Sequence, residues 1–317
     1  MDVLRFALRK LLAGVPLILG VTLLSFTLMV HFGPDRTFEL LGKNPTTEQI
    51  AELRHQLGYD QPFLLRYGQY LRELLTLDFG HSDATGEKVA SLLARSIPVS
   101  LALVLPGFVL GNLLGVALAL LAASCRGRWP DRLIMAAAVF GMSISFLVVI
   151  FVFQIWFCTS HGLDLFPVRG WGMADVPDYL RHVTVPTLAV VFVALGYNTR
   201  FYRAVIVEEM ERDHVRTARA FGSPPLRLFC RDILKNCAIP IITRITFTIP
   251  AIVIGGALLL ETSFGIPGAG KVTYEAIISG DQPVLKAVVG LTAMLFVAAL
   301  LVADILYRVV DPRVSLE

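Results

Sequence analysis

Long apolar runs alternate with polar segments along the whole chain. Six runs of mostly apolar residues lie near positions 11–32, 98–124, 133–158, 183–205, 237–260 and 284–307. Each is long enough to cross a bilayer as a helix, which takes about 20 residues. Of the 317 residues, 55% are hydrophobic and only 17% are charged, which is too apolar for an ordinary soluble domain. The pattern predicts an all-α membrane protein with six transmembrane helices.

Basic residues are distributed unevenly between the connecting segments. With the N-terminus inside, the inner segments hold 16 Lys and Arg in 64 residues, and the outer segments hold 10 in 109. The short loop "CRGRWPDR" at 125–132 shows the bias most clearly. Because Lys and Arg are retained on the cytoplasmic side, we expect both termini to be cytoplasmic. The net charge of +3 then reflects topology and does not indicate a nucleic-acid partner.

The first run can also be read as a cleavable signal peptide. No small-x-small cleavage site follows it, since the chain continues "MVHFGPDR". We therefore interpret it as a retained first span.

Residues 33–96 separate the first two runs and show helical periodicity. Apolar residues recur at helical spacings in two pieces, which are interrupted at Gly58 and Pro62. Thr47 can cap the first piece, with Thr46 as the alternative. This outer helical segment could lie on the outer leaflet, present a surface to a binding protein or pack on the membrane domain. We favour packing.

The stretch "GIPGAGKVTYE" at 265–275 imitates a phosphate-binding loop. Gly265, Gly270 and Lys271 fit the pattern G-x-x-x-x-G-K-[ST], but Val272 has no hydroxyl to hold Mg²⁺. The stretch also follows the outer end of a membrane helix rather than a buried strand. We interpret it as a tight re-entrant turn that binds no nucleotide.

The longest inner segment, residues 208–244, has a helix–turn–helix pattern. Gly222 can end one helix in the left-handed conformation, Ser223 can cap the next, and Pro224 suits a first helical turn. We expect the chain to re-enter the membrane near Pro240. A basic helix with small residues can enter a groove on another protein. The alternative is a solvated loop that binds nothing or binds anionic lipid.

This inner segment resembles the cytoplasmic loop of permease subunits of binding-protein-dependent ABC importers, in the dipeptide, oligopeptide and nickel group. The resemblance starts from "DHVRTARAFG" and the eighteen positions from Gly222 to Pro240. It continues, in order, through 57–82, 128–134, 261–277 and 304–314. It implies a type I importer fold, a single permease domain over residues 1–317 and a coupling loop at 208–240.

The resemblance also implies partners and functional residues. The partners would be a second permease subunit, two cytoplasmic ATP-binding subunits that hold ATP and Mg²⁺, an extracytoplasmic substrate-binding protein and the lipids of a bacterial inner membrane. The chain itself would be no enzyme and would bind no cofactor. The coupling residues would be Asp213, Arg216, Thr217, Ala218, Arg219, Ala220, Gly222 and Ser223.

Two segments of the chain depart from the family pattern. Importer permeases in general begin this loop with Glu-Ala-Ala, whereas this chain has Arg216, Thr217 and Ala218. The peptide branch commonly lacks that Glu. After the first span the family usually reads close to Pro-Gly-Asp-Pro, and this chain has "GPDR" at 33–36.

Polar residues inside spans are costly and therefore mark candidate sites. We assign Asn112, Gln154 and Glu261 to the translocation path, although the two amides could also bond across packed helices. Arg244 is expected to extend its head to the inner surface. Asp304 and Arg308 are spaced to form a structural pair.

Three other classes of function are compatible with parts of the pattern. A nickel permease of the same family is the nearest alternative, but His161 and His182 form no compact ligand set and the four cysteines suggest no metal site or disulfide. A secondary transporter should carry ion-coupling charges at mid-membrane. An intramembrane enzyme should carry a nucleophile or metal group inside the spans. We therefore expect the permease subunit of an ATP-driven importer, most simply for di- or oligopeptides.

Overall fold

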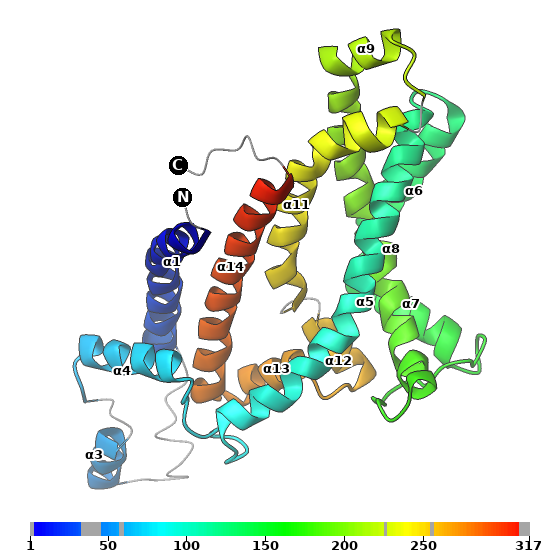
Figure 1. The fold of residues 1–317 in the computed structure, drawn as a ribbon. Helices are drawn as coiled ribbons and strands as arrows, with labels where there is room; N and C mark the ends of the chain where they lie inside the picture. Colours follow the sequence, from blue (N-terminus) through cyan, green and yellow to red (C-terminus); the bar gives the residue numbers. More distant parts are fainter. Residues whose placement is uncertain (1–2, 33–45, 57–59, 225–226, 254–256, 311–317) are drawn as a thin grey trace. The chain divides into compact units, whose positions relative to one another are not determined.

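The computed structural model describes residues 3–32, 46–56, 60–224, 227–253 and 257–310. Within these ranges the chain is built from helices, and the only β pairing is a bridge between His81 and Lys88. The helices are α1 (Val3–Phe32), α3 (Thr47–Gln56), α4 (Phe63–Thr76), α5 (Val89–Ser124), α6 (Trp129–Ser143), α7 (Phe146–Cys158), α8 (Val176–Met210), α9 (Asp213–Ala220), the π-helix η1 (Leu228–Ile233), α11 (Leu234–Ala251), α12 (Ala257–Phe264), α13 (Ala269–Ser279) and α14 (Gln282–Val310) (Figure 1).

The described residues contain fewer single spanning helices than the six that the apolar runs predict. Among the described residues, four helices are long and apolar enough to cross a membrane, namely Leu12–Phe32, Val89–Ser124, Val176–Met210 and Gln282–Tyr307. The predicted third run is not straight, because α6 and α7 meet at a bend of 98°. The predicted fifth run is divided between α11 and α12, and residues 254–256 between them lie outside the described ranges.

The chain divides into two compact units. Unit 1 comprises residues 1–95 and 272–298, and unit 2 comprises residues 96–271 and 299–317. Helices α5, α13 and α14 each contribute residues to both units. The prediction of one permease domain over residues 1–317 stays a prediction.

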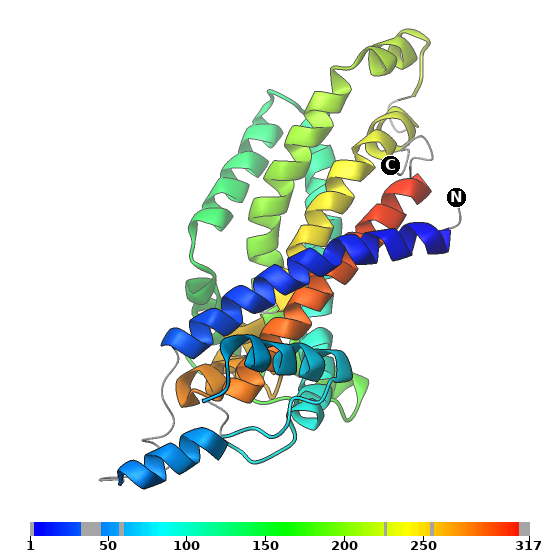
Figure 2. The same cartoon turned by 90° about the vertical axis from the view of Figure 1, so that its left-hand side faces the viewer.

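In unit 1, α4 packs on α1 and on the first part of α14. The Tyr70 hydroxyl donates to the Lys286 carbonyl at 2.9 Å, and the Tyr67 hydroxyl lies 3.0 Å from Thr22 Oγ1. Phe26 of α1 stacks on Tyr70 with ring centroids 5.8 Å apart. Figure 2 shows the ribbon of α4 beside that of α1. Burial raises the pKa of Tyr70 to about 12. The outer segment therefore packs internally through α4, as expected.

The exposed face of α4 is apolar as well. Leu64 and Leu75 are 77% and 80% exposed, whereas Leu74 is 2% exposed. The helix thus has one buried apolar face and further leucines that face away from unit 1.

Helix α3, in the predicted outer segment, begins with a reciprocal capping box. The Gln49 N–H donates to Thr46 Oγ1 at 3.3 Å, and the Thr46 N–H donates to Gln49 Oε1 at 3.1 Å. The cap is therefore Thr46, and the preference for Thr47 was wrong. A Thr followed three residues later by Gln is the signal that identifies this cap. The interruption predicted at Gly58 lies outside the described residues.

In unit 2, α5 and α8 approach each other along a stripe of glycines. A Cβ atom at Gly107, Gly111 or Gly115 would lie within 3 Å of the side chain of Val190, Ala194 or Asn198, respectively. Small residues let membrane helices pack at short distance, and this spacing of four keeps the contact on one face of α5.

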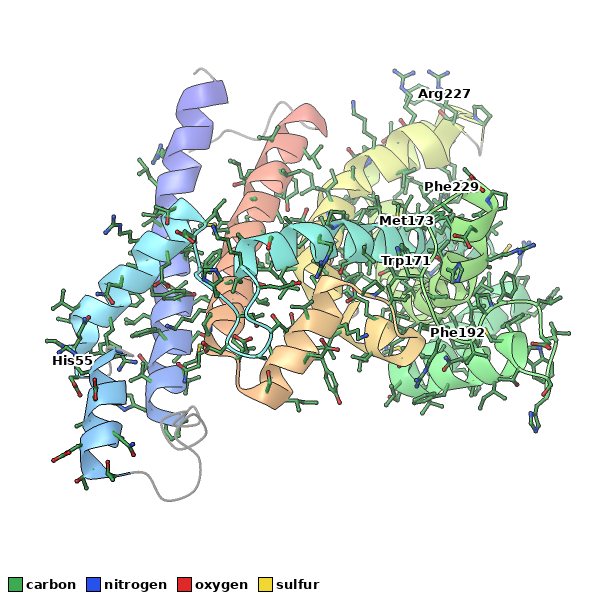
Figure 3. The ribbon with its side chains drawn as sticks, turned by 90° about the horizontal axis from the view of Figure 1, so that it is seen from below. His55, Trp171, Met173, Phe192, Arg227 and Phe229 are labelled. Carbon is green, nitrogen blue, oxygen red and sulfur yellow. The ribbon has the colours of Figure 1, made fainter. Side chains whose placement is uncertain are left out.

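An ion pair fixes α6 against α8. Asp131 is 4% exposed and accepts hydrogen bonds from Arg203 Nε and Nη2, each at 2.6 Å. Phe153 of α7 meets Phe192, near the middle of α8, edge to face. Trp171 meets Tyr179, near the start of α8, in the same way (Phe192 and Trp171 are labelled in Figure 3). Unit 2 is thus held together at both ends of α8.

Candidate functional site

Helix α9 is a short amphipathic helix beyond the C-terminal end of α8, whereas α12 lies near the opposite end of α8 (Figure 1). Val215 is fully buried in a cluster with Tyr202, Ile206 and Ile233. The opposite face of α9 is polar, and the Arg216 side chain is 71% exposed. Val215 thus anchors α9 on unit 2, together with a contact of His214 with Glu209 at 3.2 Å, while Arg216 stays exposed.

The C-terminal end of α9 is closed by a Schellman motif. The Gly222 N–H donates to Arg219 O at 3.0 Å, and the Ser223 N–H donates to Ala218 O at 3.1 Å. Gly222 has φ of 76° and nothing lies within 4 Å of a Cβ built on it. The backbone conformation, rather than lack of space, therefore requires glycine. The predicted helix end is confirmed, whereas the cap proposed for Ser223 would act on residues 225–226, outside the described ranges.

The assigned coupling residues do not all face the same way. Ala218 is half-buried and packs against the cluster around Val215, and Ser223 is also half-buried. The other assigned residues are exposed, namely Asp213, Arg216, Thr217, Arg219, Ala220 and Gly222. Phe221, which is 86% exposed next to Gly222, was not among the residues predicted from the sequence. An aromatic residue among basic ones in a turn was the signal that could have found it.

Two ion pairs brace the segment around α9. Arg126, in the loop before α6, contacts Glu211 at 2.6 Å, and Arg212 contacts the buried Glu209 at 3.0 Å. The loop 125–128 therefore lies beside the start of the 208–240 segment. Both belong to the inner segments predicted from charge.

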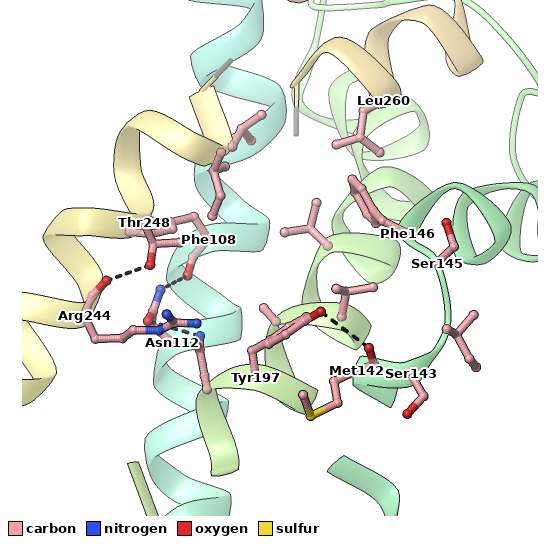
Figure 4. A pocket seen from close by; sticks show the side chains of 17 residues that line it. Phe108, Asn112, Met142, Ser143, Ser145, Phe146, Tyr197, Arg244, Thr248 and Leu260 are labelled. Atoms are coloured by element: carbon pink, nitrogen blue, oxygen red, sulfur yellow. Dashed lines mark hydrogen bonds between the residues drawn. The ribbon is translucent and has the colours of Figure 1, made fainter. Parts of the chain in front are cut away.

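Unit 2 also contains a cavity of about 520 Å³. It is lined by α5, α8, α11, α12 and the residues at the bend between α6 and α7 (Figure 4). The lining is mostly apolar, with Val104, Phe108, Val190 and Leu260 among its residues. The bend between α6 and α7, which the sequence did not predict, thus forms part of the wall of a cavity whose volume is typical of ligand sites.

Asn112 lies in the cavity wall at the centre of a hydrogen-bond network. Its Oδ1 accepts from the Tyr202 hydroxyl at 2.6 Å and from Asn198 Nδ2 at 3.2 Å, and its Nδ2 donates to Phe108 O at 2.8 Å. Asn198 lines the cavity too. Sequence analysis missed Asn198 and Tyr202, although a second asparagine inside a span was visible.

The other two residues assigned to the path lie elsewhere. Gln154 is buried, and its Nε2 donates to Val168 O at 2.7 Å and to Ser263 O at 3.4 Å. Glu261 is fully buried. Neither residue lines the cavity that contains Asn112. The structure therefore does not bring the three together.

Glu261 instead organises the loop that resembles a phosphate-binding loop. Its Oε1 accepts from Ser100 Oγ at 2.5 Å, and its Oε2 accepts from the Lys271 N–H at 2.8 Å. Ser100 Oγ in turn accepts from the Ala269 N–H at 2.7 Å. The N–H groups of Ala269 and Lys271 at the start of α13, which would meet a phosphate, are thus occupied by the chain's own hydroxyl and carboxylate.

The glycines of this loop are needed for close packing. A Cβ at Gly268 would overlap the Glu261 carboxylate, and one at Gly270 would lie 2.5 Å from Leu258 N. Gly265 has φ of 68°. The glycines that imitate a nucleotide motif therefore serve a tight turn, as the sequence predicted.

Arg244 of α11 contributes a charged side chain to the same cavity. Its side chain lines the cavity, with the guanidinium carbon 5.6 Å from the centroid of the Phe201 ring. Helix α11 begins at Leu234, so Arg244 lies about 15 Å along its axis, and the expectation that its head reaches the inner surface stays a prediction. The side chain of Arg308 lies outside those that the structure describes, so the ion pair expected between Asp304 and Arg308 stays a prediction.

Among the described residues, no three His, Cys, Asp or Glu side chains lie together as a metal site would require. His182 contacts Asp178 at 3.4 Å, and Cys125, Cys158 and Cys237 are free thiols.

These elements define a helical permease of the inner membrane, and the chain belongs to the family described as "Binding-protein-dependent transport system inner membrane component". The family model matches residues 97–316, and the model of its N-terminal component matches residues 3–104. The two matches together span nearly the whole chain. The resemblance seen in the sequence is thereby confirmed.

Relatives of known name match over the full length. The chain is 30% identical over 313 residues to the "Putative peptide transport system permease protein" of Brucella abortus (strain 2308), covering 98% of each chain. It is 31% identical to the "Glutathione transport system permease protein" of Salmonella typhimurium, covering 98% of this chain and 99% of the relative.

A solved structure shares the fold. A chain of the inward-facing MetNI methionine ABC transporter aligns with a TM-score of 0.55 at 18% identity, covering 69% of this chain and 96% of that chain. The chain therefore has, over this aligned part, the fold of an ABC importer transmembrane subunit.

Proposed function

We propose that this chain is one of two permease subunits of an ATP-driven importer of di- or oligopeptides. The observation that carries the proposal is its likeness, over 98% of its length, to proteins named for peptide and glutathione transport. Glutathione is itself a short peptide, so these names agree on one substrate class. They do not favour the nickel alternative, and membership of an ABC importer family argues against a secondary transporter.

In the proposed assembly the second permease subunit completes the translocation path, and two ATPase subunits bind and hydrolyse ATP with Mg²⁺. An external binding protein delivers the peptide. Helix α9 and the turn at Phe221 and Gly222 would dock on an ATPase subunit, because they are exposed while Val215 anchors them to α8. Closure of the ATPases would thus be transmitted to α8 and α11.

Reconstitution tests this function. The complete complex, with ATP enclosed in the vesicles and binding protein outside, should take up a radiolabelled short peptide. We expect uptake to fall to background when the nucleotide-binding lysine of the partner ATPase is replaced. ATP-dependent uptake of nickel or another solute, with no peptide transported, would contradict the proposal.

Topology gives a second prediction. Gln69 on α4 and Glu211 at the end of α8 are both exposed. In a chain lacking the four native cysteines, Gln69→Cys should react with an impermeant thiol reagent on intact spheroplasts, whereas Glu211→Cys should react only after the membrane is opened. The reverse pattern would place α9 outside and rule out docking on a cytoplasmic ATPase.

A further inference from the structure

Arg244 brings a cation into the wall of the cavity in unit 2. Among the described residues it forms no ion pair, and its Nε is buried without a hydrogen-bond partner. Its guanidinium lies instead over the face of the Phe201 ring. Burying part of a guanidinium without an anion is unfavourable, and a cation–π contact compensates for only part of that cost.

The rest of the lining does not neutralise this charge. None of the other residues that line the cavity carries an ionisable acidic or basic group other than the Tyr197 phenol. The Thr248 hydroxyl donates to the backbone carbonyl of Arg244 at 2.6 Å, and the polar atoms of Asn112 are used within their own network. Arg244 is therefore the charged group that sets the potential of the cavity.

A helix end adds to the same potential. Ser145 and Phe146, at the N-terminal end of α7, form part of the wall (Figure 4), and Ser145 makes no side-chain cap for this helix of 13 residues. The N-terminus of a helix favours negative charge. The cavity thus combines apolar walls with positive potential.

We propose that Arg244 binds a carboxylate of the transported peptide while the apolar wall receives its side chains. The proposal rests on the proposed function, and it assigns substrate recognition to the permease as well as to the binding protein. A guanidinium matches a carboxylate through two parallel hydrogen bonds. Phe108, Val190 and Leu260 provide the apolar surface, and a cavity of about 520 Å³ has the size typical of ligand sites.

The test compares one peptide in two forms. A tripeptide with uncharged side chains is supplied, preloaded on the binding protein, either with a free C-terminus or as its C-terminal amide. Uptake by reconstituted complexes with Arg244→Gln is divided by uptake with the parent chain for each form, so that selectivity of the binding protein cancels. We expect at least a tenfold loss for the free acid and less than a threefold change for the amide.

Two variants serve as controls. Arg244→Lys keeps the charge and should retain part of the acid uptake. Arg132→Gln removes an exposed arginine of α6 that does not line the cavity, and it should leave both ratios near one. If Arg244→Gln does not assemble, Arg244→Lys decides the question, because the weaker match of an ammonium should lower acid uptake more than amide uptake.

The outcomes separate this inference from the proposed function. Equal losses for acid and amide would show that Arg244 acts structurally or pairs with a carboxylate of the second permease, and would overturn the inference while the proposed function stands. Parent-like uptake of both forms by Arg244→Gln would overturn it as well. A parent complex that transports another solute but neither peptide would defeat the proposed function, and this inference with it.

Discussion

Glu261→Ala should strongly destabilise unit 2. The substitution removes the acceptor of Ser100 Oγ and of the Lys271 N–H, and it leaves a void in a fully buried position. Each buried donor without an acceptor costs about 1–3 kcal/mol, so the total loss should be about 3 kcal/mol or more. For a domain of this size, that loss lowers the melting temperature by about 6–12 °C.

The measurement is the temperature at which the detergent-solubilised permease aggregates, followed by size-exclusion chromatography. Glu261→Gln keeps the shape of the side chain, but its amide places a donor beside Ser100 Oγ or the Lys271 N–H, which are donors themselves. The melting temperature of Glu261→Gln should therefore lie between those of the parent and Glu261→Ala. Parent-like melting of Glu261→Ala would show that the hydrogen-bond network does not hold the loop.

Lys271→Ala is the matched control in the same loop. The bond to Glu261 comes from the backbone N–H of residue 271, which alanine retains, so melting should change little. ATP hydrolysis by the assembled complex should stay within a few-fold of the parent, because the N–H groups of Ala269 and Lys271 already bond within the chain. Crosslinking of a nucleotide to this chain that disappears on Lys271→Ala would contradict this interpretation of the loop.

The sequence predicted the elements whose signal is local. Apolar run length located the long spans, and Gly222 marked the end of α9 because a left-handed residue followed by Ser223 closes a helix end through backbone bonds alone. The departure of 265–275 from the phosphate-binding pattern was visible in Val272, a single side chain at a fixed offset. In each case the deciding residues lie within a few positions of one another.

The sequence could not predict features that depend on distant partners. The role of Glu261 depends on Ser100, which is 161 positions away, so a carboxylate at a span end looked like a path residue. The bend at Ile144 occurs inside an apolar run that contains no proline or charge. Ala218 was expected to face a partner, but Val215 fixes the rotation of α9 and turns Ala218 inward.

The inward position of Ala218 changes which substitutions test docking of α9. Ala218→Trp would disturb internal packing as well as any contact with a partner, so its loss of function would be ambiguous. Phe221 is a cleaner position, because its side chain is 86% exposed. Gly222 is equally clean, since a side chain there meets no atom within 4 Å.

Phe221→Asp and Gly222→Val should each reduce peptide uptake by the assembled complex at least tenfold while the membrane helices stay folded. Phe221→Asp replaces an exposed aromatic side chain with a charge, which should weaken the proposed docking of this turn on an ATPase subunit. Gly222→Val forces a β-branched residue to adopt positive φ, which costs about 1–2 kcal/mol, and so opens the turn that presents Phe221. Copurification of the ATPase subunits and uptake at matched permease levels measure both effects.

Matched variants separate docking from folding. Gly222→Asn tolerates the left-handed conformation and should keep most of the uptake that Gly222→Val loses. Ala122→Trp, at a fully buried position of α5, should instead impair folding or pairing with the second permease. If Phe221→Asp and Gly222→Val both transport like the parent, α9 and its turn are a solvated basic loop, and ATPase closure must reach α8 and α11 through another surface.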